Sequence, residues 1–421
     1  MRLVFASVLA SMLVLPGCTR ETVSHEAAPT APDAFSVERL ASSSGGATDL
    51  VMFFEPWDGE EDSPLDVLRE LGLEDLLVEI VGRVAHLDGV PAELTALLSD
   101  ARILAVQPNN GVVLSAPSDL TMAFFEGDVT PTDVLLRPEF AALRLDRVHG
   151  AARGEGLRIA VLDTGADTQH PLLQSRLELL GVQSLGDVHE VADGIDEDGD
   201  GLIDEAFGHG SHVAGIIATV APGATIVPLP VLSDDGVGTA YQLAVALQAA
   251  IAAEVDVINL SLSIHEDSGV VRALLDRARA NGIAIVAAAG NTGDQVTLPA
   301  AYESSTGAGA TIVDMTRLAE FSARGIDLEF AAPGTEVLSC YPGGEWALAS
   351  GSSMAAAVLS GAVAVIASSD PSITVQDAEV RLAEAAVPID PEGSVLFGRV
   401  DLIGALGDLG TRPTKFRLHQ N

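Results

Sequence analysis

One serine in the C-terminal half of the chain has neighbours that could make its hydroxyl a nucleophile. Ser353 follows two small residues and precedes the long uncharged run Met354–Ala367, which is typical of a buried helix. At a helix N-terminus, free N–H groups and the helix dipole favour negative charge, so an oxyanion could form beside the hydroxyl. Taken alone, Ser353 is explained more simply as the N-cap of a helix rich in small residues.

Three other polar residues stand at the ends of apolar segments. Asp163 and Asn291 each end one such segment, and His209 stands just before a segment that begins a helix. Singly, these residues are ordinary: a turn aspartate, a cap and a surface histidine. In parallel sheets, however, the carboxyl ends of the strands share one edge, where ligands bind. An acid, a base and a hydroxyl gathered at that edge could carry out nucleophilic catalysis.

The segments that would position these residues alternate between strands and helices. Strands are predicted at Leu157–Leu162, Ile226–Leu229, Val255–Leu260 and Ile283–Ala288, and helices at Tyr241–Ala253 and Val270–Ala280. The pair Asn281-Gly282 would end the second helix. Such alternation predicts an α/β domain in which a mostly parallel sheet is flanked by helices on both faces.

Four ordered motifs give the chain a close resemblance to the subtilisin-like serine proteases, the subtilases. They are IAVLDTGADTQHP, GHGSHVAG, AAAGN and SGSSMAAA, and the similarity extends over about residues 143–406. The order of acid, base and nucleophile is that of the subtilisins. The resemblance implies a three-layer subtilisin-like fold and a serine endopeptidase that hydrolyses protein or peptide substrates through an acyl-enzyme.

The resemblance also assigns roles to the polar residues. It identifies Asp163, His209 and Ser353 as a catalytic triad and Asn291 as an oxyanion donor, and it favours His209 over His212 as the base. The serine would attack the substrate carbonyl, the histidine would take its proton, and the aspartate would orient the imidazole. Two alternative functions remain: a catalytically inactive interaction module of the same fold, and a hydrolase of esters with the same triad.

Two positions depart from the family pattern. Ala356-Ala357 stand where the family usually has Ser or Thr followed by Pro, and Ser263 replaces a glycine in the segment VINLSLS, which pairs with substrate in the family. Neither change touches the triad. The first removes a rigid ring near the nucleophile and the second could narrow the substrate groove, so both bear on substrate preference.

Residues 48–117 are predicted to form a small α+β domain with a ferredoxin-like order of elements. Strands are expected at Leu50–Phe54, Val78–Leu87, Ile103–Gln107 and Val112–Ser115, and helices at Ser63–Leu71 and Pro91–Leu98. The stretch Val81–Ser115 resembles the end of a subtilase propeptide, which implies an intramolecular chaperone and inhibitor made as part of a zymogen. The alternative is a small domain without an inhibitory role.

The remaining boundaries follow from composition. Residues 118–140 contain two prolines, Pro131 and Pro138, among polar residues and follow Pro117, so they are interpreted as a linker that a protease could cut. The peptidase domain is expected at residues 141–407, followed by a tail at 408–421.

A run of acidic residues precedes the GHGSHVAG motif. Asp196, Asp198 and Asp200, with Asp204 nearby, begin the spacing of an EF-hand loop, but Phe207 stands where the closing glutamate would be. Alternate carboxylates around a glycine turn still suit a hard cation, and some subtilases bind calcium near this motif. These four aspartates are therefore predicted to hold a structural calcium ion. The alternative is a solvated acidic loop, and the absence of an HExxH pattern argues against zinc.

The composition bounds the possible partners. Of the 421 residues, 48% are hydrophobic, which is enough for a large core, and the formal net charge is −38 with Lys415 as the only lysine. This charge excludes nucleic acid as a partner, because phosphates need cationic neutralisation.

Residues 1–18 indicate an export signal, in which Arg2 precedes an apolar run too short for a comfortable membrane span. The segment LPGC resembles a bacterial lipobox, which implies that Cys18 carries lipid and holds the chain at the membrane. The proline is unusual there, so simple secretion is the alternative, and the protein is expected in the cell envelope or outside the cell.

Residues 19–47 indicate a flexible tether. A lipidated Cys18 would leave Cys340 without a disulfide partner.

Overall fold

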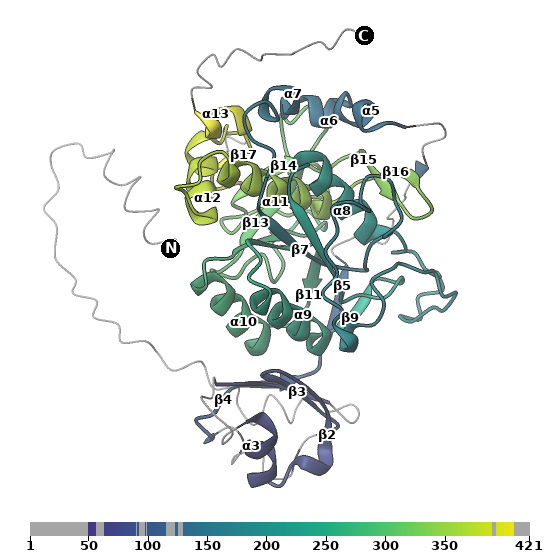
Figure 1. The fold of residues 1–421 in the computed structure, drawn as a ribbon, viewed down its shortest axis with the longest axis vertical. Helices are drawn as coiled ribbons and strands as arrows, with labels where there is room; N and C mark the ends of the chain where they lie inside the picture. The colour runs from purple at the N-terminus through teal and green to yellow at the C-terminus, as the bar shows by residue number, and fades with distance from the viewer. Residues whose placement is uncertain are drawn as a thin grey trace, which may run out of the picture.

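The computed structural model describes residues 49–55, 63–89, 91, 97, 99–114, 123–124, 129–389 and 393–407. In these residues a small sheet, drawn in purple, lies against one side of a much larger α/β body (Figure 1). The expected export signal, lipid anchor, tether and C-terminal tail lie outside the described residues. None of the described helices combines the length and apolar character that a membrane crossing needs.

The large body is built on a seven-stranded sheet whose neighbouring strands all run parallel. In spatial order the strands are β17 (Gly398–Arg399), β14 (Phe330–Pro333), β13 (Thr306–Thr311), β12 (Ala284–Ala288), β10 (Val257–Leu260), β7 (Arg158–Asp163) and β8 (Thr225–Pro230). Helices cover both faces, as a parallel sheet requires. The predicted α/β class is confirmed.

Different helices bury the two faces of this sheet. One face is covered by α8 (His209–Val220) and α11 (Ser352–Ser368), and the other by α9 (Ala240–Ala252) and α10 (Gly269–Ala280). Along β7, Ile159 and Val161 enter the first core, whereas Ala160 and Leu162 enter the second. This alternation follows from the two-residue period of a strand. The first core also includes α7 (Leu145–Val148), α12 (Val375–Ala385) and α13 (Leu402–Leu406).

The small N-terminal sheet is antiparallel, with the strand order β2-β3-β1-β4. It consists of β1 (Leu50–Phe54), β2 (Leu77–Val81), β3 (Val84–Leu87) and β4 (Ile103–Pro108), accompanied by α3 (Pro64–Glu70) and a 3-10 turn at Glu74–Leu76. Ser63 caps α3 as predicted, with its Oγ accepting a hydrogen bond from the N–H of Asp66 at 3.3 Å.

One predicted strand of this region is wrong. The segment Val78–Leu87 does not run straight, because the chain reverses at Gly82, where φ is +56°, and its two halves pair as β2 and β3. The helix predicted at Pro91–Leu98 lies mostly outside the described residues.

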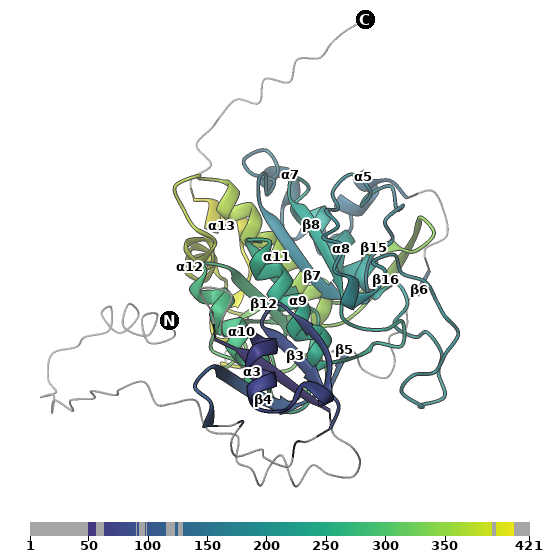
Figure 2. The same ribbon diagram turned by 60° about the horizontal axis from the view of Figure 1, so that its bottom comes forward.

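The next strand leaves the small sheet and enters the large body. Strand β5 (Gly111–Leu114) lies between β11 (Leu262–Ile264) and β9 (Val237–Thr239), antiparallel to both. The small sheet itself packs on α9 and α10, and Figure 2 shows β3 and β4 in front of these helices. The two regions therefore share a backbone ladder as well as a packed face.

Side chains of the small domain cap both of these helices. The Oε1 atom of Gln107 accepts a hydrogen bond from the N–H of Val270 at 2.9 Å, in the first turn of α10. The Oδ1 atom of Asn109 accepts one from the N–H of Tyr241 at 2.9 Å, in the first turn of α9. Free N–H groups at helix starts need such partners, so the contact stabilises the two helices as well as the interface.

Part of the segment interpreted as a linker folds onto the large body. Helices α5 (Pro131–Leu135) and α6 (Pro138–Ala141) each begin with a proline, and their residues Val134 and Phe140 are buried in the first core. The prolines that suggested a linker are helix starts instead. Residues 129–140 are therefore not a free linker. Upstream, β6 (Ala123–Phe124) pairs with β16 (Glu345–Ala349), the partner of β15 (Val337–Tyr341).

Candidate active site

Three segments meet at the carboxyl end of β7, and two glycines allow their close approach. A Cβ atom at Gly165, where φ is +126°, would lie 2.5 Å from the carbonyl oxygen of Val188. A Cβ atom at Gly210 would lie 2.2 Å from the carbonyl oxygen of Gly165. Any side chain would push apart the end of β7, the segment near Val188 and the start of α8. This is the physical reason for the glycines in the DTG and HG motifs.

Asp163 and His209 form a buried hydrogen-bonded pair at this meeting point. The Oδ1 atom of Asp163 lies 2.7 Å from Nδ1 of His209, and both side chains are fully buried. The same Oδ1 accepts a hydrogen bond from the N–H of Thr164 at 2.8 Å. Among the described residues, Nε2 of His209 has no hydrogen-bond partner. Because the carboxylate holds Nδ1, Nε2 is the nitrogen left to accept a proton.

His212, three residues further along α8, has a different environment. Its Nε2 donates to two backbone carbonyls, lying 3.0 Å from that of Val337 and 3.1 Å from that of Ala347. Burial, and then the nearby His209, lower the pKa of His212 to about 3. This ring is therefore neutral and held by β15 and β16, so His209 is the better candidate for a base.

Ser353 lies in the first turn of α11, as its sequence context predicted. The N-cap residue Gly351 supplies no capping side chain. The Oγ atom of Ser353 donates to the carbonyl of Ser261 at 3.3 Å, just beyond the end of β10. Strand β10 lies beside β7, so the hydroxyl is held at the same sheet edge as Asp163. In this structure the hydroxyl does not donate to His209.

Asn291 contacts the start of the same helix through one atom and leaves the other unpaired. Its Oδ1 accepts a hydrogen bond from the N–H of Ser352 at 2.8 Å. Its Nδ2 is buried and has no hydrogen-bond partner in the described part of the chain. A Cβ atom built on Gly351 would lie 3.5 Å from this Nδ2, so the unpaired donor faces the N-terminus of α11. A donor in that position is suited to developing negative charge.

A backbone groove runs beside these residues and is filled by the chain itself. Strand β11 follows directly on Ser261, and β5 pairs with it so that Leu114 lies opposite Leu262. Val112 is fully buried between the two regions. The departure at Ser263 does not close the groove, because its Oγ lies 2.9 Å from Oγ1 of Thr297 and its backbone still pairs with β5.

The acidic loop differs in part from its prediction. Carboxylate oxygens of Asp196, Asp198 and Asp200 come within 4.8 Å of one another, as the alternate spacing suggested. The expected ligand Asp204 is in none of the acidic groups among the described residues. It adopts φ of +55° and accepts hydrogen bonds from the N–H of Gly194 instead.

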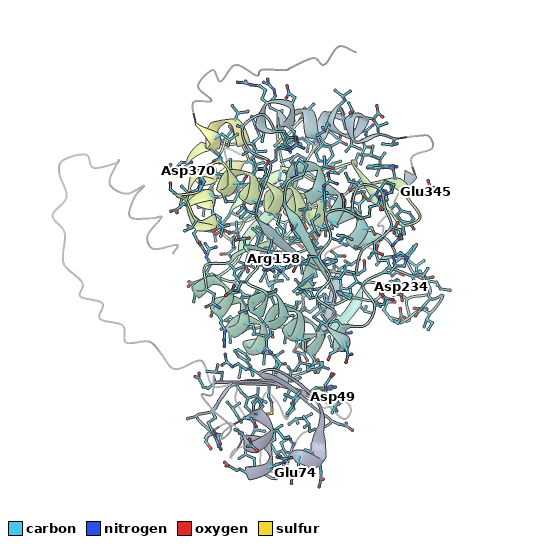
Figure 3. The ribbon with its side chains drawn as sticks, in the orientation of Figure 1. Asp49, Glu74, Arg158, Asp234, Glu345 and Asp370 are labelled. Atoms are coloured by element: carbon cyan, nitrogen blue, oxygen red, sulfur yellow. The ribbon has the colours of Figure 1, made fainter. Side chains whose placement is uncertain are left out.

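Acidic residues beyond the four predicted ligands also take part in the loop. Asp198 lies with Glu205 and Asp235, and a third group contains Asp193, Glu197 and Asp234. Figure 3 shows Asp234 on the loops at the edge of the large body. Burial, and then a hydrogen bond with Asp235, raise the pKa of Glu205 to about 7. Asp234 and Asp235 come from a later loop, outside the acidic run, so no local spacing could identify these two residues as ligands.

Comparison with known proteins places the large body in one family. Residues 154–404 match the model of the subtilase family. The chain is 33% identical over 263 residues to an intracellular serine protease of Paenibacillus polymyxa, which covers 58% of this chain and 77% of the relative. It is 31% identical over 259 residues to subtilisin DY of Bacillus licheniformis, which covers 58% of this chain and 89% of that protein.

A solved structure extends the similarity in fold. The chain aligns with fervidolysin from Fervidobacterium pennivorans, described as a keratinolytic enzyme related to subtilisin, with a TM-score of 0.69 and 22% identity. The alignment covers 86% of this chain and 61% of that one. The identity is too low to carry more than the fold. Together with the family match, these comparisons show that the chain belongs to the subtilase family and is a subtilisin-like serine endopeptidase.

Proposed function

We propose that this endopeptidase cleaves peptide bonds with Ser353 as nucleophile, His209 as general base, Asp163 as the partner of the imidazole and Asn291 as an oxyanion donor. The observation that carries the proposal is the buried pair of Asp163 and His209, which leaves Nε2 as the proton acceptor. The unpaired Nδ2 of Asn291 at the start of the serine's helix supports it.

The residues provide each step of acyl transfer. The Oγ atom of Ser353 forms a bond to the substrate carbonyl carbon while its proton moves to Nε2 of His209. The carbonyl oxygen becomes an oxyanion that accepts hydrogen bonds from Asn291 and from the backbone N–H of Ser353. The C–N bond then breaks, and the amine leaves with the proton from His209. A water molecule releases the acyl group by the same steps in reverse order.

The test of these roles is labelling with a fluorophosphonate, which reacts only with an activated serine. Label should be found on Ser353 by mass spectrometry, and Ser353→Ala should lose both labelling and casein digestion. Ser360→Ala is a matched control, because it removes a buried hydroxyl from the same helix that donates only to Asn259 at 2.9 Å. Asn291→Ala should lower kcat by roughly 10²–10³-fold. Labelling at another serine, or digestion of short esters but not casein, would contradict the proposal.

We infer that the small N-terminal domain is an inhibitory propeptide. Strand β5 fills the groove between β11 and β9 as a substrate backbone would. Its antiparallel pairing places Leu114 opposite Leu262. Leu262 follows Ser261, whose carbonyl accepts the hydrogen bond from the Ser353 hydroxyl, so the next residue of the chain after Leu114 continues in the direction of Ser261. The chain therefore runs toward the nucleophile as it leaves β5. We expect cleavage at the first or second bond after Leu114.

The processing test uses the full chain. Wild type should yield a fragment whose N-terminal sequence begins just after Leu114, whereas Ser353→Ala should stay full-length. Gln107→Ala/Asn109→Ala removes both helix caps of the interface, so the released propeptide should inhibit the mature enzyme more weakly. A wild-type chain that stays full-length and fully active would contradict the inhibitory role.

We also propose that the protein is exported and anchored through lipid on Cys18. The support is the export signal and the LPGC segment of the sequence. Cleavage after Leu114 would then separate the anchor from the peptidase, so activation and release would be one event. Wild-type catalytic fragment should appear in the soluble fraction, with Ser353→Ala retained on the membrane. Full-length active enzyme in the membrane fraction would contradict release, and Cys18→Ser tests the anchor.

We propose that calcium binds the acidic loop, where it would have a structural role. Grouped carboxylates suit a hard divalent ion, and the structure brings two such groups together through their shared Asp198. The residues that would hold the ion are Asp196, Asp198 and Asp200, with Glu205 and Asp235 completing the set.

A further inference from the structure

Glu190 is a buried carboxylate that the proposed mechanism does not use. It follows the isolated bridge between Ala166 and His189, and only 6% of it is exposed. Its hydrogen-bond partners are hydroxyl and N–H groups rather than a cation. A buried charge without a cation is stable only where several donors converge on it.

Four donors from two segments converge on this carboxylate. Its Oε1 accepts hydrogen bonds from Oγ1 of Thr164 and from the N–H of Gly210 at 3.2 Å. Its Oε2 accepts hydrogen bonds from Oγ of Ser211 and from the N–H of Ser211 at 3.2 Å. Thr164 directly follows the triad acid, and Gly210 and Ser211 directly follow the base. One side chain therefore joins the two segments that carry the hydrogen-bonded pair.

Helix α8 depends on this carboxylate for its N-terminal cap. The N-cap residue Gly208 has φ of +87° and no side chain to accept from the first turn. The N–H groups of residues 210 and 211 are buried and need acceptors. Glu190 accepts from both at the positive end of the helix dipole, and Oγ1 of Thr164, itself bonded to Glu190, shares the N–H of Gly210 at 2.9 Å. Because His209 is the first residue of α8, any shift of the helix start moves the imidazole directly.

The charge of Glu190 also lies within the electrostatic environment of the pair. Burial raises its pKa, hydrogen bonds from Ser211 and Thr164 lower it, and the charge of Asp163 raises it again. The pKa of Tyr341 is raised by burial and then by the charge of Glu190. An ionised Glu190 adds a negative charge that favours the imidazolium formed during catalysis.

We propose that Glu190 is a positioning residue of this peptidase, which holds Thr164 and the first turn of α8 together and so keeps His209 aligned with Asp163 and Ser353. This inference rests on the triad roles proposed above. It predicts an effect on turnover more than on substrate binding, because the hydrogen bonds that Glu190 accepts all come from the two segments that carry the pair.

The test is Glu190→Gln in the full chain, measured after processing. The amide keeps the size but turns one acceptor into a donor facing other donors. Expected is a fall in kcat of roughly 10- to 100-fold with little change in KM. The acid limb of the pH–rate profile should move to lower pH, because the amide no longer stabilises the imidazolium with a second negative charge. Glu190→Asp keeps the charge, so it should return the midpoint toward wild type and recover part of kcat.

The matched control is Glu379→Gln. Glu379 is also a buried carboxylate, accepts a hydrogen bond from Oγ1 of Thr306 at 2.9 Å and pairs with Arg279 at 2.6 Å. Its replacement should lower the melting temperature while kcat and the pH midpoint stay at wild-type values. If Glu190→Gln does not fold, Ser211→Ala removes one of the four donors and should lower kcat in the same direction by a smaller factor.

The outcomes are separable. If Glu190→Gln and Ser211→Ala lose only stability, as Glu379→Gln does, and keep the wild-type kcat and pH midpoint, Glu190 has a purely structural role and the inference is wrong. If Ser353→Ala retains activity, the triad assignment fails instead, whatever Glu190 does.

Discussion

The start of α8 and the acidic loop before it use the same chemical group under opposite conditions. At the helix start, the carboxylates of Asp163 and Glu190 are buried and receive hydrogen bonds from hydroxyl, imidazole and N–H groups. In the loop, Asp196, Asp198 and Asp200 are more exposed and receive hydrogen bonds mainly from the backbone of their own loop. Buried charges need donors, so specific hydrogen bonds hold each carboxylate of the first group in position.

This difference predicts which property of the enzyme, turnover or stability, each group of carboxylates affects. The buried carboxylates hold the geometry of the reacting groups, and their replacement should change turnover. The exposed carboxylates repel one another, and their environment changes with the cations in solution. Replacement there should change stability in a cation-dependent way and leave turnover intact.

The largest expected effect is that of Asp163→Asn. The amide keeps the shape but no longer fixes the tautomer of His209, so kcat should fall by roughly 10³–10⁴-fold. Steady-state kinetics on a peptide substrate measure the effect. Asp167→Asn is the control, because Asp167 is also buried but receives its hydrogen bonds from Gln169, Gly343 and Gly344. Loss of turnover only in the control would show that the buried network has been assigned to the wrong aspartate.

A smaller effect is expected from removal of calcium. An ion that binds only the folded protein at about 100 times its dissociation constant adds roughly 2.7 kcal/mol to the free energy of unfolding. Thermal unfolding with chelator should therefore give a lower melting temperature for wild type, and a smaller change for Asp196→Ala/Asp198→Ala. The exposed turn residue Asp314 provides a control, since Asp314→Ala should keep the full response. A melting temperature that ignores chelator would remove calcium from the loop.

The same contrast explains how much the sequence could predict. Asp163, His209 and Ser353 stand in motifs because close backbone approaches, such as that of Gly210 to Gly165, leave little freedom in the residues around them. Glu190 has no such signal, because it lies in an irregular segment and meets its partners only in the fold.

Elements were also missed for identifiable reasons. Strand β13 has the sequence TGAGAT, whose small residues carry no strand pattern, yet every one is buried where α11 contacts the sheet. The division of Val78–Leu87 into two strands depends on one glycine, Gly82, in a segment whose apolar alternation continues across the turn. Apolar periodicity identifies buried surface, and it does not show where a strand reverses.

A further buried group at the start of α8, the imidazole of His212, should make the stability of the protein depend on pH. Burial first and His209 second lower the pKa of His212 to about 3 in the folded protein, against 6.5 for an ordinary histidine. Between these values the unfolded chain binds more protons than the folded protein. The contribution of His212 to the free energy of unfolding is therefore complete above about pH 6.5 and decreases toward acid by up to roughly 1.4 kcal/mol per pH unit.

The variant His212→Gln has no ring to titrate but keeps an amide donor for the carbonyls. Denaturant unfolding should show it to be less stable at neutral pH and to lose less stability between about pH 6 and 4 than wild type does. All other titrating groups are shared, so the difference between the two curves isolates this residue. Parallel curves would contradict a neutral buried His212, and a variant that folds but has lost turnover would contradict the choice of His209 as the base.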